Sequence, residues 1–149
     1  MGEMEELDSI DLHIIEKLRE DGRTPFTKIA AELNVSPGMI RMRYNRLVER
    51  GYLQIVAITN PLNIGYNAVA LIGIRVEGRK LVQVAEAIAQ FEEVDYLIIT
   101  SGRFDLFAEV ICRDHDELFN FLSEKLYQID GVKESETFMH LRIVKEIYI

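Results

Sequence analysis

The chain has 149 residues, 48% of them hydrophobic, and its 25 acidic and 17 basic side chains give a net charge of −8. This composition predicts a packed globular protein and excludes a disordered or low-complexity chain. The apolar runs are shorter than the roughly 20 residues of a membrane helix, and the acidic start is unlike a signal peptide. We therefore expect a cytoplasmic protein with no membrane partner.

The first third of the chain predicts three short helices. Asp8 is a suitable N-cap for the first helix, on which apolar residues recur every four positions. Thr24 and Pro25 can supply the N-cap and the first position of the second helix, and Ser36 and Pro37 can do the same for the third. The break between the second and third helices is only about three residues long, which is typical of a helix-turn-helix.

The predicted third helix, which ends at Arg50, has two unlike faces. Apolar side chains occupy one face at 100° per residue, and the other face carries small residues, an amide and guanidinium groups. Residues 36–50 hold four arginines against Glu49 alone, a net charge of +3, whereas residues 1–60 together carry −2. Such a helix can enter the major groove of DNA while neighbouring residues hold phosphates. The predicted DNA contacts are Arg23, Thr24, Ser36, Pro37, Gly38, Met39, Arg41, Met42, Arg43, Asn45 and Arg46.

A linker follows the three helices. Residues 52–59 are rich in β-branched and aromatic side chains, and Asn60, Pro61 and Gly65 come next, a pattern that predicts a short strand and a hinge. We place the domain boundaries at residues 1–52 for the helix-turn-helix, 53–66 for the strand and hinge linker, and 67–149 for a second domain.

The second domain alternates between strand and helix patterns. Strands are predicted over residues 68–76, 94–100, 104–112 and 132–147, and helices over residues 80–90 and 114–129. The order βαββαβ is that of a ferredoxin-like domain with helices on one face of an antiparallel sheet, so the whole chain is α+β. Because the first three strands are almost continuously apolar, we expect another subunit to bury the open face. Cys112 lies in one of these strands and is predicted to be a buried thiol.

In order and spacing, these segments resemble the Lrp/AsnC family of prokaryotic transcription regulators, named for leucine-responsive and asparagine-responsive members and also called the feast/famine family. The resemblance runs from Leu7 to Lys145, and its N-terminal part includes Asp21-Gly22-Arg23 and Val35-Ser36-Pro37. In the second domain, residues 101–106 are similar to the family's Gly-x-Tyr/Phe-Asp loop. The resemblance implies a winged or three-helix helix-turn-helix joined to a ferredoxin-like domain.

The resemblance also implies partners. Members pair their second domains sheet to sheet as homodimers, assemble further to tetramers or octamers, and bind an amino acid between dimers near the Gly-x-Tyr/Phe-Asp loop. A dimer predicts a palindromic operator in double-stranded DNA. At the loop, Gly102 can leave peptide N–H groups open to a carboxylate, and Asp105 can receive an ammonium group. The predicted effector residues are Ser101, Gly102, Arg103, Asp105 and Thr137; no cofactor or metal is expected.

Plainer interpretations stay open for both sites. The arginines of the third helix can simply solvate its surface, Gly102 can serve a hairpin turn only, and Asp105 can brace that turn by accepting backbone N–H bonds. His13, His115 and His140 are isolated in the sequence, which favours structural or surface roles over catalysis or metal binding.

Two other functions remain as alternatives to a DNA-binding regulator. The sequence lacks P-loop, GxGxxG, HExxH, GxSxG and CxxC spacings, yet sirohaem decarboxylases resemble this family in fold and are enzymes. Such an enzyme would give a Soret band on titration with a tetrapyrrole and need not retard DNA. A ligand-sensing module without DNA binding is the other alternative, and the capping signals and basic face of the third helix disfavour it.

Overall fold

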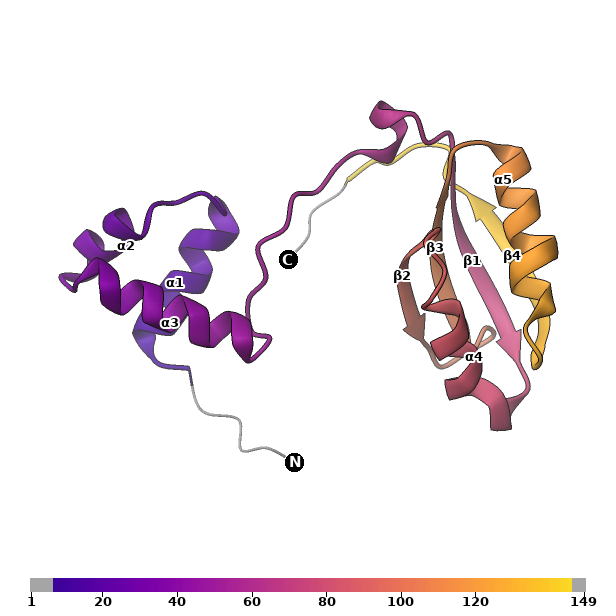
Figure 1. The fold of residues 1–149 in the computed structure, drawn as a ribbon, viewed down its shortest axis with the longest axis horizontal. Coiled ribbons are helices and arrows are strands. Elements are labelled where there is room, and N and C mark those ends of the chain that lie inside the picture. Colours follow the sequence, from indigo (N-terminus) through magenta and orange to yellow (C-terminus); the bar gives the residue numbers. More distant parts are fainter. Residues whose placement is uncertain (1–6, 146–149) are drawn as a thin grey trace. The chain divides into compact units, whose positions relative to one another are not determined.

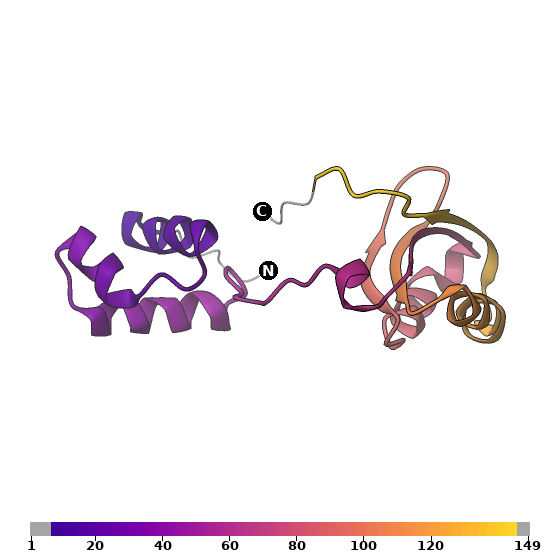
Figure 2. The ribbon, with the colours of Figure 1, turned by 90° about the horizontal axis from the view of Figure 1, so that it is seen from above.

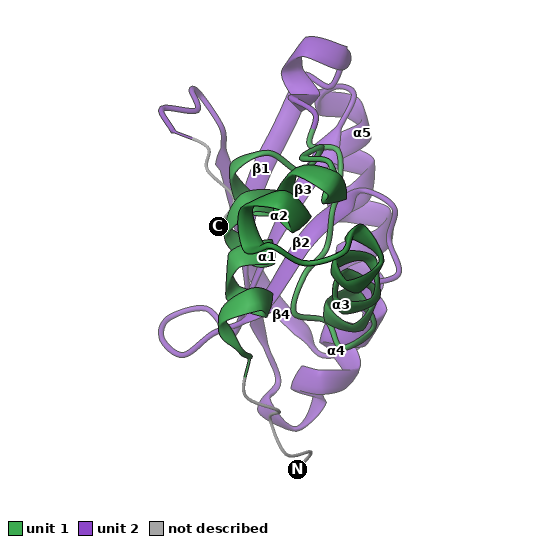
Figure 3. Ribbon diagram, turned by 90° about the vertical axis from the view of Figure 1, so that its left-hand side faces the viewer, with its two compact units in different colours: residues 1–58, 148–149 green, residues 59–147 purple. Residues whose placement is uncertain are grey.

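A computed structural model of the protein describes residues 7–145. The chain divides between Ile58 and Thr59 into two compact units, each with its own core (Figure 3). Unit 1 holds the three N-terminal helices, and unit 2 holds a four-stranded sheet with its helices (Figure 1). None of the helices in the described range is long and apolar enough to cross a membrane.

Unit 1 is built from α1 (Ser9–Glu20), α2 (Phe26–Leu33) and α3 (Pro37–Glu49). The side chain of Asp8 accepts the first amides of α1, and that of Ser36 accepts an amide of α3, so both predicted N-caps are confirmed. The three helices bury one apolar cluster, whose largest fully buried side chains are Ile14, Ile29, Ile40 and Leu47.

The segments around the helices differ from the sequence predictions at two places. The N-cap of α2 is Pro25, and the Thr24 hydroxyl instead donates to the carbonyl oxygen of Asp21 at 2.8 Å. Residues 53–60 belong to no helix or strand, so the predicted strand is absent there, and a 3₁₀ turn over Pro61–Ile64 follows. With no strand in residues 7–58, unit 1 has the three-helix form and lacks a wing.

Unit 2 carries the predicted βαββαβ order. Its strands are β1 (Ala68–Val76), β2 (Val94–Ile99), β3 (Leu106–Cys112) and β4 (Val132–Met139), arranged antiparallel as β2-β3-β1-β4. The helices α4 (Leu81–Ile88) and α5 (His115–Asn120) lie on the same face of the sheet (Figure 2). This arrangement is the ferredoxin-like fold.

The opposite face of the sheet carries an aromatic cluster. The ring of Phe104 lies directly over Gly73, where an added Cβ would come within 2.7 Å of the ring. Phe107 and Phe138 meet the same ring edge-on, at centroid distances of 5.5 and 6.3 Å. Leu71 on β1 lies beside this aromatic cluster, because it is the register partner of Phe138 on β4. We call this surface the open face; none of the helices described in unit 2 covers it.

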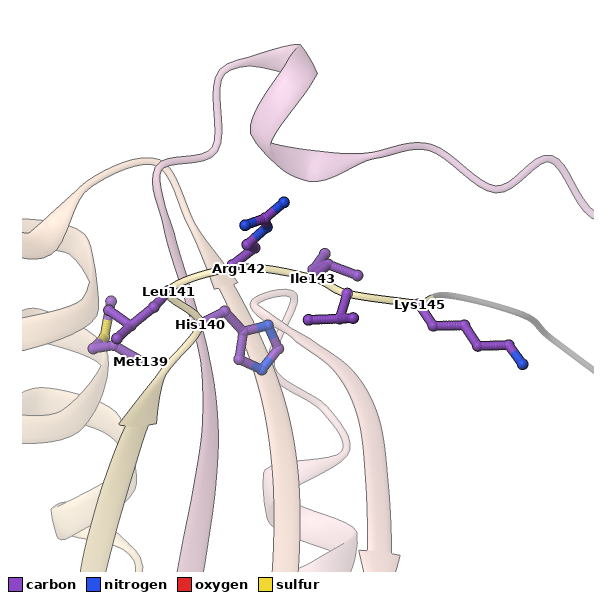
Figure 4. Close-up of a pocket in the computed structure, with 7 residues that line it drawn as sticks. Met139, His140, Leu141, Arg142, Ile143 and Lys145 are labelled. Carbon is purple, nitrogen blue, oxygen red and sulfur yellow. The ribbon is translucent and has the colours of Figure 1, made fainter.

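Three elements of unit 2 are one to two residues shorter than predicted at an end, and two differ by more. The helix predicted over residues 114–129 leaves α-helical geometry at Phe121, where a π turn and then a 3₁₀ turn continue it to Gln128. Strand β4 ends at Met139 and not at residue 147; residues 146–149 fall outside the described range. The tail that follows borders a shallow hollow of about 680 Å³, and the described residues that line it are 139–145 (Figure 4).

Candidate nucleic-acid interface

The outward face of α3 is open to solvent within unit 1. Met42 is 65% exposed and Met39 36% exposed, although both are apolar. Ile40 and Leu47, on the opposite side of the same helix, are buried against α1 and α2. The other exposed members of the predicted groove face are Ser36, Pro37, Gly38, Arg41 and Asn45. The helix therefore has the two-faced character that groove insertion requires.

The other two predicted arginines of α3 form ion pairs with aspartates at the start of α1. Arg43 Nη1 donates to Asp8 Oδ2 at 2.6 Å and to Asp11 Oδ1 at 3.0 Å. Arg46 Nη2 donates to Asp11 Oδ2 at 2.8 Å. The side chain of Asp11 is only 1% exposed, so its charge is removed from water and shared between the two guanidinium groups. We call these four residues the α1–α3 ion cluster.

This cluster revises the interpretation of the basic patch. The two aspartates balance Arg43 and Arg46, so the free positive charge on α3 is smaller than its arginine content indicates. Arg43, with a side chain 19% exposed, has the structural role of holding α1 against α3, whereas the Arg46 side chain is 42% exposed. Sequence reasoning did not identify Asp11 as the partner; the capping-box spacing of Asp8 and Asp11 is the signal that could have placed it.

The ion cluster makes the stability of unit 1 depend on pH. The Asp11 backbone amide and the Arg43 guanidinium lower the pKa of Asp8 below its ordinary value of 3.8. A lowered carboxylate pKa adds stability above the unfolded pKa, and this is lost as the pH falls through the folded value. We predict that Asp8→Asn, which keeps the N-cap, reduces the loss of thermal stability between about pH 6 and pH 2.

The matched comparison for this titration is Glu16→Gln, because Glu16 lies exposed on the same helix. Thermal unfolding of both variants across the pH range measures the effect. An Asp8→Asn variant with the pH dependence of the unmodified chain would contradict the role assigned to the Asp8 carboxylate.

Arg23 and Thr24, the two residues predicted to contact phosphates near the start of α2, differ in their exposure and in their hydrogen bonds. Arg23 is exposed, and within residues 7–145 its side chain has no ion-pair partner. Its backbone amide donates to Asp21 Oδ1 at 2.9 Å, which fixes the turn. Thr24 is half-buried and its hydroxyl is already donated to Asp21, so only Arg23 offers an unpaired group for a phosphate.

The predicted effector loop lies between β2 and β3. Gly102 has φ +130°, which a side chain would strain, and Ser101 and Arg103 are exposed beside it. Asp105 Oδ2 accepts the backbone N–H of Val76 at 2.8 Å, so this carboxylate braces the end of β1. The carboxylate thus accepts a backbone N–H, but from β1 and not from the turn at Gly102 that the plainer interpretation named.

Thr137 does not join this loop within one chain. It pairs with Ile72, whose side chain is fully buried on the helix-covered side of the sheet. The next residue, Gly73, faces the other way, against the Phe104 ring. The hollow along residues 139–145 includes none of the predicted effector residues. The five residues therefore form no closed pocket inside a single described unit.

The cysteine and one of the histidines lie in surroundings that indicate structural roles. Cys112 is fully buried, and burial raises the pKa of its thiol to about 11. His13 Nε2 lies 2.9 Å from Glu32 Oε2, in an exposed pair between α1 and α2. Within residues 7–145, no three His, Cys, Asp or Glu side chains are grouped to hold a metal ion.

Comparison with known proteins gives matches to both units. Residues 7–48 match the model of the AsnC-type helix-turn-helix domain, and residues 69–148 match that of the Lrp/AsnC ligand binding domain. An uncharacterized HTH-type transcriptional regulator of Pyrococcus horikoshii is 43% identical over 89% of this chain and 84% of its own length. The HTH-type transcriptional regulator LrpA of the same organism is 38% identical over 85% of this chain and 90% of its own.

Solved structures agree with the fold. AsnC of E. coli matches with a TM-score of 0.84 and 26% identity, over 97% of this chain and 99% of its own. A transcriptional regulator of Neisseria meningitidis in complex with L-Met matches with a TM-score of 0.81 over 95% and 94% of the two chains. At 21% identity the second match supports the fold alone.

Proposed function

The chain belongs to the Lrp/AsnC family of DNA-binding transcription regulators, and on this premise we propose that it reads a palindromic operator through the outward face of α3. The exposure of that face carries the proposal. Met39, Arg41, Met42 and Asn45 are exposed, while the buried side of the same helix fixes its orientation. An Asn amide or an Arg fork on such a face discriminates a base pair by about 1 to 3 kcal/mol.

Two copies of unit 1 are needed for tight binding. One three-helix unit makes few phosphate contacts, and the α1–α3 ion cluster further limits its free positive charge. We propose that the open face of unit 2 supplies the dimer contact, because its aromatic cluster around Phe104 is apolar and lacks a cover within the described unit. Tetramers or octamers of such dimers are part of the proposal.

We propose an amino acid or a related small metabolite as the effector. The exposed backbone at Gly102 and the Arg103 guanidinium can receive a carboxylate, and the second oxygen of Asp105 can receive an ammonium group. Because these groups are not enclosed within one unit, the site would be completed by a neighbouring subunit, to which Thr137 would contribute from its own sheet. The match of residues 69–148 to the Lrp/AsnC ligand binding domain supports a ligand at this domain.

We further propose that the chain acts as a regulator and not as an enzyme. The relatives it matches carry the name of transcriptional regulators. A regulator works in the compartment that holds the chromosome, so a cytoplasmic location is part of the proposal. Titration with a tetrapyrrole is expected to give no Soret band from a bound complex, and such a band would favour the enzyme alternative.

The operator-binding proposal is tested by placing a negative charge on the groove face. The full chain first selects duplexes from a random pool, and binding of the selected duplex is then measured by fluorescence anisotropy. Met42→Glu is expected to weaken binding by about a hundredfold, since a carboxylate would face phosphates and base edges. Val82→Glu, at a position 62% exposed on α4, is the matched control and should bind as the unmodified chain does. Equal binding by both variants would exclude the α3 face.

A further inference from the structure

The α1–α3 ion cluster treats its two arginines differently. Arg43 directs one nitrogen at both aspartates and is largely buried. Arg46 donates from Nη2 to Asp11 alone within the described residues, and its side chain keeps 42% of its surface exposed. A guanidinium group has five N–H donors in a fixed planar fork. The bond to Asp11 therefore occupies one corner of Arg46 and leaves other donors available.

Arg46 lies where the groove face of α3 meets α1. On α3, Arg46 lies one residue before the buried Leu47 and one after the exposed Asn45, at the edge of the groove face that adjoins α1. Asp11 approaches from the α1 side and is itself fixed, because it is buried and its Oδ2 accepts the Asp8 amide at 3.3 Å. The exposed 42% of the Arg46 side chain shows that the rest of this side chain reaches solvent.

We propose that Asp11 is a positioning residue for DNA binding, which holds Arg46 by one nitrogen so that its remaining donors meet a backbone phosphate at the edge of the groove. This inference rests on the proposed function. A free arginine loses rotamer entropy when it binds a phosphate, and a side chain already held in place loses less. Arg46 therefore loses this rotamer entropy when the protein folds and not when DNA binds. Its planar guanidinium group also restricts the directions from which a phosphate can accept its hydrogen bonds.

The proposal makes a prediction whose sign separates it from simple electrostatics. Asp11→Asn removes a negative charge from unit 1, which by itself should strengthen binding to DNA. If Asp11 positions Arg46, the same substitution instead weakens binding, because the guanidinium loses its charged anchor. We expect a loss of about tenfold, the size of one charge-assisted hydrogen bond.

A double-mutant cycle distinguishes positioning from a general effect on folding. Asp11→Asn, Arg46→Ala and the double variant are compared on the duplex selected by the unmodified full chain. We expect Asp11→Asn to weaken binding in the unmodified background and to change it by less than about twofold in the Arg46→Ala background. Equal losses in both backgrounds would overturn the proposal, since a merely structural role acts with or without Arg46.

Glu16→Gln is the matched control for charge. Glu16 lies on α1 like Asp11, but it is exposed and makes no ion pair within residues 7–145. Its loss should strengthen binding slightly and equally in both backgrounds. Weakening by Glu16→Gln to the same extent as by Asp11→Asn would overturn the proposal, because the effect would then not depend on contact with Arg46.

Arg46→Lys keeps the test valid if Asp11→Asn fails to fold. The position is partly exposed and the charge is retained, so the variant should fold, which far-ultraviolet circular dichroism checks. A lysine side chain has a single nitrogen and cannot bind Asp11 through one nitrogen while it donates to a phosphate from another. We therefore expect the affinity for the selected duplex to fall by about fivefold. Binding equal to the unmodified chain would overturn the proposal. Failure of the unmodified chain to select any duplex would instead refute the proposed function itself.

Discussion

Leu71→Asp should convert the proposed dimer into monomers. Leu71 lies at the centre of the open face, where its register partners are Glu109 on β3 and Phe138 on β4. A second carboxylate beside Glu109 would be buried without a partner if two open faces met. We expect the dissociation constant of the dimer to rise by about a hundredfold or more, as at a central interface residue. Sedimentation equilibrium of the full chain measures it.

The control introduces the same aspartate on the other side of the sheet. Val82→Asp places the same carboxylate on α4, on the helix-covered side of the domain, at a position 62% exposed. This variant should retain the mass of the unmodified protein. A Leu71→Asp chain that remains dimeric at the same concentrations would show that subunits associate through a different surface.

Arg43→Met should produce the second large effect, on the stability of unit 1. The substitution keeps most of the side-chain length but leaves Asp11 Oδ1 without its donor, in a carboxylate that is 1% exposed. Leaving a buried carboxylate oxygen without a donor costs about 3 kcal/mol, because Asp11 Oδ1 is then neither hydrated nor hydrogen-bonded, although Arg46 still pairs with Oδ2. Urea unfolding of the full chain, followed by helical circular dichroism, measures the loss.

Arg41→Met is the matched comparison on the same helix. Arg41 is exposed and makes no ion pair within the described part of the chain, so its replacement should change the free energy of unfolding by less than about 0.5 kcal/mol. Similar losses for Arg41→Met and Arg43→Met would mean that the ion cluster contributes little to stability.

Local sequence signals were sufficient for most of the fold. The caps at Asp8 and Ser36 form as predicted, because an N-cap depends on residues two or three positions away. Strand β1 has the predicted bounds, since its apolar run is flanked by turn residues at both ends. The alternation of strands and helices then allowed only a few topologies, and the ferredoxin-like order is the one observed.

The features that the sequence did not predict depend on contacts between distant residues. The pairing of Asp11 with Arg43 and Arg46 joins positions more than thirty residues apart and appears only when α1 packs on α3. The segment 53–60 has strand-forming side chains but no partner strand in the described chain, and β propensity alone does not create a ladder. The same holds for the residues after Met139, where pairing with β1 ends.

The two candidate sites differ in how far local sequence could predict them. The exposed face of α3 could be predicted, because helical periodicity separates it from the buried Ile40 and Leu47. The effector residues were less predictable, because the partner of the Asp105 carboxylate is the amide of Val76, 29 positions away at the end of β1. Thr137 lies on the opposite side of the sheet from Phe104, which only the strand register determines.

Cleavage of DNA from a reagent attached to α3 tests the central claim most directly. The single native cysteine, Cys112, is fully buried with its thiol pKa raised to about 11, so Met42→Cys adds a selectively reactive thiol for an iron–EDTA label. The labelled full chain, bound to its selected duplex, should cut at two symmetric positions separated by about 10 base pairs or a multiple of that spacing. A chain labelled at Phe119→Cys, 66% exposed on α5, is the reference for cleavage from elsewhere on the protein. Binding of the duplex without cleavage above that reference would contradict the placement of α3 in the groove.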